Sequence, residues 1–239
     1  MYPDGTITQG GYSSHIRCHE YFVFPIPDNI PTELAAPMLC AGITTYSPLV
    51  RLGAGPGKKV GIIGVGGLGH FGILFAAALG AEVYAISHSP RKKEDALQLG
   101  ARHFVDTSEK GWHKPYAFTF DFIINTADAT HKFNLPDYFS TLKVMGTFHN
   151  VGMPDHPIEK LKLQDFVANC CYLGTSHLGN RLEMLSMLAL ASKQNIKSWV
   201  QTVDISAEGC KEVVEKVAKG DVRYRFTLVN YDKQFGKRA

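Results

Sequence analysis

The 239-residue sequence lacks the features that would assign it to several specialised classes of protein. Its 25 basic and 22 acidic residues leave a net charge of only +3, which favours neither nucleic acid nor an anionic membrane surface as a partner. No apolar run reaches about 18 residues, so we expect no transmembrane helix. The first residues lack a basic segment followed by an apolar core, so no signal peptide is expected. A content of 45% hydrophobic and 20% charged residues is instead typical of a globular chain with a large core.

Cysteine is scarce, and the five cysteines do not follow the spacing of a disulfide framework. Their number is odd, no Cys-x-x-Cys motif occurs, and Cys170 and Cys171 are adjacent in a predicted strand, where we expect core packing. This usage is typical of a reducing compartment, so we expect a cytoplasmic protein. Cys18 and His19 have the composition of a metal site, but alternation along a strand would point them to opposite faces, which favours a structural role.

The distribution of apolar segments predicts an α/β fold. From residue 59 onward, short apolar strands alternate with helices, which is typical of a parallel sheet covered on both faces. We expect strands at 59–63, 82–87, 103–106, 120–125, 144–151, 170–175 and 225–229. We expect helices at 32–52, 66–79, 90–100, 180–193 and 207–219. Before them, residues 1–12 have loop and hairpin composition, and residues 14–18 and 22–27 alternate as strands do.

A glycine-rich turn separates the strand at 59–63 from the helix that follows it. Gly64, Gly66 and Gly69 form a Gly-x-Gly-x-x-Gly motif in the strand–turn–helix context that dinucleotide binding requires. Gly64 would permit the tight turn, Gly66 would let the backbone approach a pyrophosphate, and Gly69 would let helix and strand pack closely. The free N–H groups at the start of the helix would face the phosphates. A turn without a ligand is the alternative, but the context favours a cofactor.

The end of the second strand distinguishes NADP from NAD. An NAD site places Asp or Glu about 20 residues after the motif, on the ribose 2′-hydroxyl. Here the strand leads into Ser87-His88-Ser89-Pro90-Arg91-Lys92-Lys93, with no carboxylate at its tip. Hydroxyls and cations suit a 2′-phosphate, which an aspartate would repel. We therefore favour NADP(H) over NAD(H), although a solvated basic helix start would have the same composition.

Motifs along the whole chain resemble the zinc-dependent medium-chain alcohol dehydrogenases, especially the NADP-preferring branch similar to cinnamyl alcohol dehydrogenase. They lie at 2–5, 9–12, 35–46, 64–69 and 220–226. The resemblance implies a Rossmann doubly wound parallel sheet plus a GroES-like β domain, incomplete here, formed by the two chain ends. It also implies hydride transfer between NADP(H) and an alcohol or aldehyde, a catalytic zinc that polarises the substrate oxygen, and a homodimer formed through the edge of the Rossmann sheet.

The resemblance further implies roles for individual residues. Cys40 matches a ligand of the catalytic zinc, and Thr44, one turn later, matches a catalytic threonine that also contacts the nicotinamide. The remaining expected cofactor-binding residues are Gly64, Gly66, Gly67, Leu68 and Gly69 in the pyrophosphate loop, Ser87, His88, Arg91 and Lys92 around the 2′-phosphate, Thr126 and Ala127 on the adenosine side, Val151 and Met153 near the nicotinamide, Thr175 and His177 at the end of the sixth strand, and Arg223 at the pyrophosphate, with Arg225 as the second choice.

Other zinc-binding motifs of this family have no counterpart in the sequence. These are a cysteine followed by Ser or Thr, a Gly-His-Glu segment, and the four cysteines of a structural zinc site, all of which precede the point where this chain begins. We therefore expect a remnant of the GroES-like domain at 1–36, the NADP-binding domain at 37–178, and a return to the first domain at 179–239. NADPH binding should survive, whereas zinc-dependent turnover should be weak or absent. Two alternatives stay open: a zinc-free NADPH-dependent reductase of quinones or enones, and a non-catalytic NADP-binding fragment or partial gene model.

Overall fold

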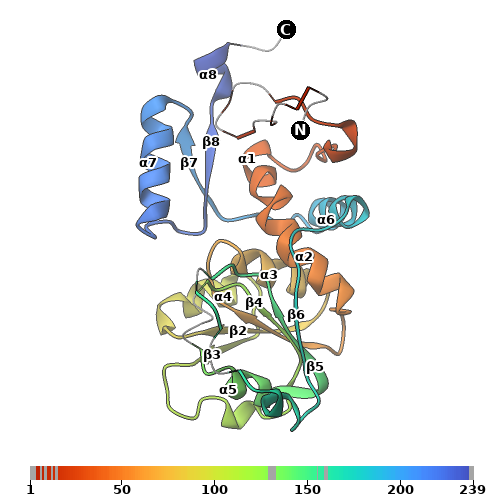
Figure 1. The fold of residues 1–239 in the computed structure, drawn as a ribbon. Helices are drawn as coiled ribbons and strands as arrows, with labels where there is room; N and C mark the ends of the chain where they lie inside the picture. Colours follow the sequence, from red (N-terminus) through yellow and green to blue (C-terminus); the bar gives the residue numbers. More distant parts are fainter. Residues whose placement is uncertain are drawn as a thin grey trace.

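A computed structural model describes residues 4–5, 7, 10–11, 13, 16–128, 133–154, 156–158 and 161–236. Its centre is a sheet of six parallel strands in the order β3-β2-β1-β4-β5-β6 (Figure 1). The strands are β1 (Lys59–Ile63), β2 (Glu82–Ser87), β3 (His103–Asp106), β4 (Phe120–Asn125), β5 (Leu142–Asn150) and β6 (Tyr172–Thr175). This is the order of a doubly wound dinucleotide-binding sheet, which confirms the α/β prediction. The first four strands have the predicted bounds, and β5 and β6 differ from them by two residues or fewer.

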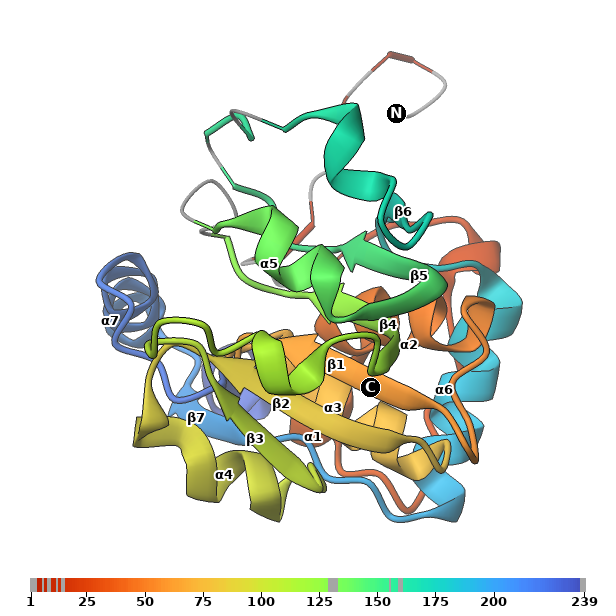
Figure 2. The ribbon, with the colours of Figure 1, turned by 90° about the horizontal axis from the view of Figure 1, so that it is seen from below.

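Apolar residues cover both faces of the sheet, because successive strand residues point to opposite sides. On one face, Val60 and Ile62 pack in a cluster that also contains buried residues of α2 (Ala41–Arg51), α3 (Gly69–Ala78), α4 (Lys93–Gln98) and α6 (Arg181–Lys193). On the other face, Ile63 and Ile123 pack with residues of α5 (Leu135–Ser140). Figure 2 shows α5 and α3 on opposite sides of the strands. None of the helices in the described part of the chain has the length and hydropathy to cross a membrane.

A smaller unit follows the central sheet. Strands β7 (Val200–Asp204) and β8 (Arg225–Val229) pair in parallel and are connected through α7 (Ala207–Ala218); α8 (Tyr231–Phe235) follows. Figure 1 shows this unit beside the short helix α1 (Thr32–Ala35), on one side of the six-stranded sheet. The sequence predicted α7 and β8, whereas β7 and α5 were missed, because the exposed residues of β7 show neither apolar alternation nor an apolar run. Its partner β8 was predicted, but β7 itself carries no local sequence signal of a strand.

The segment before α1 differs from its prediction. Residues 16–19 and 23–27 form no strand, and Glu20–Phe22 is one 3-10 turn (η1). Phe22 and Val23 are largely exposed, so no neighbouring strand buries the alternating side chains. The prolines at positions 25 and 27 also lack the N–H that a strand would donate. Most of the predicted loop and hairpin at 1–12, and residues 14–15, lie outside the described residues.

Several predicted elements are shorter than expected. The helix expected at 66–79 spans Gly69–Ala78, and the helix expected at 90–100 is a 3-10 turn (Pro90–Lys92) followed by α4. The helix expected at 32–52 is divided into α1, a 3-10 turn η2 (Ala36–Leu39) and α2, with the break at Cys40. Pro37 explains the change, since its ring removes a backbone donor in the middle of the segment. The sixth strand begins at Tyr172, so Cys170 and Cys171 precede it. Cys171 is buried as predicted, but Cys170 is exposed in a turn with a left-handed φ of 51° and does not belong to the core.

Candidate functional site

A cleft of about 860 Å³ lies at the carboxyl ends of the central strands. Its floor contains Ile63 and the glycine-rich turn after β1, together with Thr126 and Ala127 after β4. Strands β1 and β4 are the neighbours from which the sheet winds in opposite directions. Doubly wound sheets bind their ligands at this switch point.

The glycine-rich turn is closely packed against the end of β4. Gly64 adopts a φ of +87°, which favours glycine, and its carbonyl accepts a hydrogen bond of 3.2 Å from Thr126 Oγ1. A Cβ atom on Gly69 would lie 1.7 Å from that same carbonyl oxygen. A Cβ atom on Gly66 would meet no atom within 4 Å, so Gly66 faces open space in the cleft. The first and third glycines therefore serve the turn and its packing, and the second leaves room for a ligand.

Arg225 of β8 adds a cation beside this turn. Its Nε donates to the Gly67 carbonyl at 2.9 Å, and its side chain lines the cleft. Burial lowers the pKa of Arg225, but guanidinium groups stay charged in proteins. Arg223, the first choice from the sequence, instead forms an exposed ion pair with Asp95 at 2.7 Å and does not line the cleft. The nearby Tyr224, Val222 and Leu178 also line the cleft and were not predicted. The sequence signal for Val222 and Tyr224 was their place in the motif at 220–226.

A buried histidine lies under the same turn. His70 Nδ1 is 3.2 Å from the Gly66 carbonyl, which can only accept a hydrogen bond, so Nδ1 carries the proton. Its Nε2 is buried without a hydrogen-bond partner among the described residues. Burial, with smaller contributions from Arg225 and Lys92, lowers the pKa of His70 to about 4. His70 is therefore neutral at physiological pH, and the sequence did not indicate this role because a helical histidine is not distinctive.

The end of β2 forms the basic part of the cleft. Ser87, His88 and Lys92 line it, whereas Arg91 is exposed outside its lining and bonds Ser89. Lys92 Nζ lies 4.6 Å from the centre of the Tyr224 ring. Thr107 and Asp128, which follow β3 and β4, line the same cleft. Thr107 directly follows β3 and Asp128 lies three residues after β4, and this closeness to strand ends is the signal by which the sequence could have identified them.

The other end of the cleft is formed by α2 and the segments after β5 and β6. Thr44, Val151, Met153 and His177 all line it. Thr44 is buried, and its Oγ1 donates to the Cys40 carbonyl at 2.8 Å, which fixes the orientation of the hydroxyl. Thr175 lies outside the lining, where its Oγ1 bonds the Asn150 carbonyl. Fourteen of the eighteen residues proposed from sequence thus line one cleft; the four that do not are Gly69, Arg91, Thr175 and Arg223.

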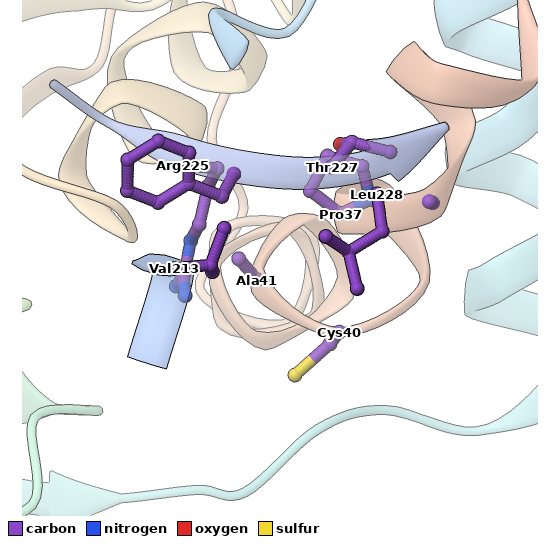
Figure 3. Close-up of a pocket in the computed structure, with 9 residues that line it drawn as sticks. Pro37, Cys40, Ala41, Val213, Arg225, Thr227 and Leu228 are labelled. Carbon is purple, nitrogen blue, oxygen red and sulfur yellow. The ribbon is translucent and has the colours of Figure 1, made fainter. Parts of the chain in front are cut away.

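Cys40 lies where this cleft meets a second pocket of about 350 Å³. Figure 3 shows the second pocket between the start of α2, β8 and Val213 of α7, with the exposed Cys40 thiol directed away from β8. A catalytic zinc needs about three protein ligands. The described residues bring no group of three His, Cys, Asp or Glu side chains together, around Cys40 or elsewhere. The donor set in this part of the chain therefore does not fit a zinc site.

Comparison with known proteins assigns the fold to a family. Residues 67–193 match the model of the family described as zinc-binding dehydrogenase, and the chain belongs to that family. The chain is 47% identical over 235 residues, 98% of its length, to NADP-dependent alcohol dehydrogenase 6 of Saccharomyces cerevisiae. Among solved structures it is similar to a cinnamyl alcohol dehydrogenase (SbCAD4) of Sorghum bicolor, with a TM-score of 0.79 and 31% identity over 90% of this chain. It is also similar to CAD of Helicobacter pylori complexed with NADP(H), with a TM-score of 0.71 and 33% identity over 84% of this chain.

These matches confirm the resemblance inferred from the sequence motifs. They include relatives of the cinnamyl-alcohol-dehydrogenase-like, NADP-dependent kind. The matched part of this chain covers 65% of the yeast enzyme, 60% of the sorghum enzyme and 56% of the Helicobacter enzyme. The chain thus spans less than two thirds of the length of each of these relatives.

Proposed function

We propose that this chain binds NADP(H) and belongs to an oxidoreductase that transfers hydride between NADP(H) and an alcohol or aldehyde. The observation that carries the proposal is the cleft itself, in which the glycine-rich turn, Arg225 and Lys92 converge at the switch point of a doubly wound sheet. The yeast relative is named as NADP-dependent and the Helicobacter relative is a complex with NADP(H), which supports the same cofactor.

In this proposal the middle of the cleft holds the pyrophosphate. Gly66, Gly67 and Leu68 line the turn at the start of α3, where backbone N–H groups and the helix dipole attract an anion. Gly64 and Gly69 keep the turn close to β1 and β4. We assign the neighbouring cation to Arg225 in preference to Arg223, because Arg225 reaches the turn and Arg223 is paired with Asp95.

The two ends of the cleft then hold the rest of the cofactor. Lys92, with Ser87 and His88, binds the 2′-phosphate, and Arg91 contributes charge from outside the lining. Thr126 and Ala127 lie beside the adenosine. The nicotinamide lies at the end formed by Thr44, Val151, Met153 and His177, with Thr175 behind them. When bound, NADPH supplies the hydride. The Thr44 hydroxyl has its proton committed to the Cys40 carbonyl, so it is oriented to accept a hydrogen bond at that end.

We derive no step through zinc for this chain, since the described residues offer Cys40 without a set of partners. We expect the 239-residue chain to bind NADPH and to show weak or no zinc-dependent turnover. The purified chain is to be titrated with NADPH while its tryptophan fluorescence is followed. No binding would contradict the cofactor assignment. One zinc per chain together with robust, chelator-sensitive aldehyde reduction would contradict the second expectation.

A second candidate function follows from the same ligand set. A zinc-free reductase of enones or quinones needs bound NADPH and a positioned acceptor, and no metal cluster. NADPH oxidation assays with an enone and with a cinnamyl-type aldehyde, each with and without chelator, separate the candidates. Chelator-resistant enone reduction favours the zinc-free reductase. NADPH binding without turnover of either substrate favours a non-catalytic NADP-binding module.

The assembly, domains and location are also proposed. We propose a homodimer through β6, an edge strand that pairs with β5 and exposes Tyr172 and Leu173. We propose the division 1–36, 37–178 and 179–239, since the six-stranded sheet falls within the middle segment and β7–β8 within the last. Five cysteines without a disulfide support a reducing, cytoplasmic location.

A further inference from the structure

Tyr224 connects the C-terminal unit to the basic end of the cofactor cleft. It directly precedes β8, is almost fully buried, and has a left-handed φ of 78°, which is uncommon for a residue other than glycine. Its ring packs on two other rings, with centre-to-centre distances of 5.2 Å to His70 and 5.1 Å to Trp199. The ring therefore has a fixed place beside the cleft that it lines.

Asp95 of α4 holds this ring from its polar end. The Tyr224 hydroxyl donates to one carboxylate oxygen of Asp95 at 2.6 Å, and Arg223 Nη2 donates to the other at 2.7 Å. Burial and the Asp95 carboxylate both raise the pKa of Tyr224, so its hydroxyl stays a donor. Asp95 thus accepts hydrogen bonds from Tyr224 and Arg223, and the Arg223 guanidinium compensates its negative charge. The Asp95 carboxylate therefore repels an anion in the cleft less strongly.

Lys92 covers one face of the Tyr224 ring. Its ammonium lies 4.6 Å from the ring centre while the side chain lines the cleft. A lysine on four flexible methylenes loses considerable rotamer entropy when it binds a single phosphate. A cation held on an aromatic face before binding loses less. Its neighbour Arg91 lies outside the cleft lining, so Lys92 is the cation of the segment 91–93 that lines the cleft.

We propose that Tyr224 is a positioning residue that presents Lys92 to the 2′-phosphate and thereby sets the preference for NADP(H) over NAD(H). The inference rests on the proposed NADP(H) site. It assigns part of the discrimination between the two cofactors to Tyr224, which directly precedes β8. Tyr224 lies far along the chain from the end of β2, where the residues proposed to contact the 2′-phosphate are found. Asp95 contributes through Tyr224 and Arg223, without touching the cofactor.

The test measures dissociation constants for both NADPH and NADH with the full 239-residue chain. Lys92→Ala should lower the ratio of NADPH to NADH affinity by about 10- to 100-fold, the range for hydrogen bonds to charged groups. Tyr224→Leu should lower the ratio by about 3- to 30-fold, the range for a cation–π contact. In both variants the affinity for NADH should stay near that of the unmodified chain. Retained NADH binding would also show that both variants are folded. Tyr116→Leu, a tyrosine packed on Tyr84 away from the cleft lining, is the matched control and should change neither constant.

A double variant separates positioning from general damage. If Tyr224 acts through Lys92, Tyr224→Leu should cause no further loss of the ratio when Lys92 is already alanine. Tyr224→Phe keeps the ring and loses only the bond to Asp95, so it should retain most of the preference; it serves as the test if the leucine variant does not fold. An equal loss of NADPH and NADH affinity in Tyr224→Leu, or additive effects in the double variant, would overturn the proposal while NADPH binding by the unmodified chain still stood. Failure of the unmodified chain to bind NADPH would instead contradict the proposed function.

Discussion

Arg225 donates a hydrogen bond from Nε to the carbonyl of Gly67, and this contact joins β8 to the glycine-rich turn. The two residues are 158 positions apart in the sequence. A carbonyl held in this way fixes the turn in the orientation that leaves Gly66 open to the cleft. The remaining guanidinium N–H groups of Arg225 supply positive charge at the same point.

Replacing Arg225 should weaken the binding of NADPH and of NADH equally. The pyrophosphate is common to NADPH and NADH, so Arg225→Ala is expected to raise both dissociation constants by about 10- to 100-fold, as for other hydrogen bonds to charged groups. Fluorescence titration with each cofactor measures the effect. Arg102→Ala, an exposed arginine outside the cleft lining, is the control and should bind both as the unmodified chain does. A selective loss of NADPH alone would show that Arg225 reads the 2′-phosphate and not the pyrophosphate.

The second and third glycines of the motif should respond differently to alanine. The added methyl in Gly69→Ala would lie 1.7 Å from the Gly64 carbonyl, so the turn must move, and we expect a loss of at least about 1–3 kcal/mol of unfolding free energy. The methyl in Gly66→Ala meets no atom, so stability should change little while NADPH affinity falls, since the methyl occupies the space for the pyrophosphate. Urea denaturation and NADPH titration of both variants make the comparison. Equal stability of the two would contradict the role given to Gly69.

His70 should make the protein less stable in mild acid. In the unfolded chain a histidine gains its proton as the pH falls through about 6.5. In the folded chain burial keeps the pKa of His70 at about 4. Protons therefore bind the unfolded state more strongly between these values, and stability is lost as the pH falls through this window.

The size of this effect can be measured against a variant without the buried imidazole. From pH 7 to 4.5 His70 should account for about 2 to 3 kcal/mol of lost stability, at about 1.4 kcal/mol for each pH unit below 6.5. Urea denaturation at both pH values should show a smaller loss for His70→Gln than for the unmodified chain. His88→Gln, which replaces an exposed histidine, should keep the full loss. Parallel behaviour of His70→Gln and the unmodified chain would exclude His70 as the source.

The sequence predicted the fold best where short-range patterns determine the structure. Strand β1, the glycine-rich turn and β2 were recovered with their bounds, because apolar runs and glycines act locally. Such patterns could not show which of Arg223 and Arg225 lines the cleft. The two residues are separated by Tyr224, whose left-handed backbone and bond to Asp95 direct one arginine to α4 and the other to Gly67. Residues 22–27 were misread for a similar reason, since alternation cannot reveal whether a partner strand exists.

The proposed dimer places a requirement on the edge strand β6. The substitution Tyr172→Glu should weaken self-association, because it would bury an unpaired carboxylate where the β6 edges of two copies meet. Sedimentation over a range of concentrations should show a shift from dimer to monomer. Val214→Glu on α7 is a matched control, since both side chains are 52% exposed. If the unmodified chain sediments as a monomer, or both variants remain dimers, the assignment of the interface to β6 fails.

Cys40 provides the last prediction, because it lines the cleft without companion metal ligands among the described residues. Cys40→Ser should leave NADPH affinity within about twofold, since the contact from this residue that orients Thr44 comes from the backbone carbonyl and survives the change. Metal analysis should find far less than one zinc per chain both before and after the substitution, because a single cysteine does not retain zinc against a chelator. Thr44→Val, which removes the hydroxyl and keeps the shape, is the contrasting variant and should weaken NADPH binding by about 3- to 10-fold. Stoichiometric zinc that disappears with Cys40→Ser would show that the thiol has metal-binding partners and would overturn the assignment of a zinc-free site.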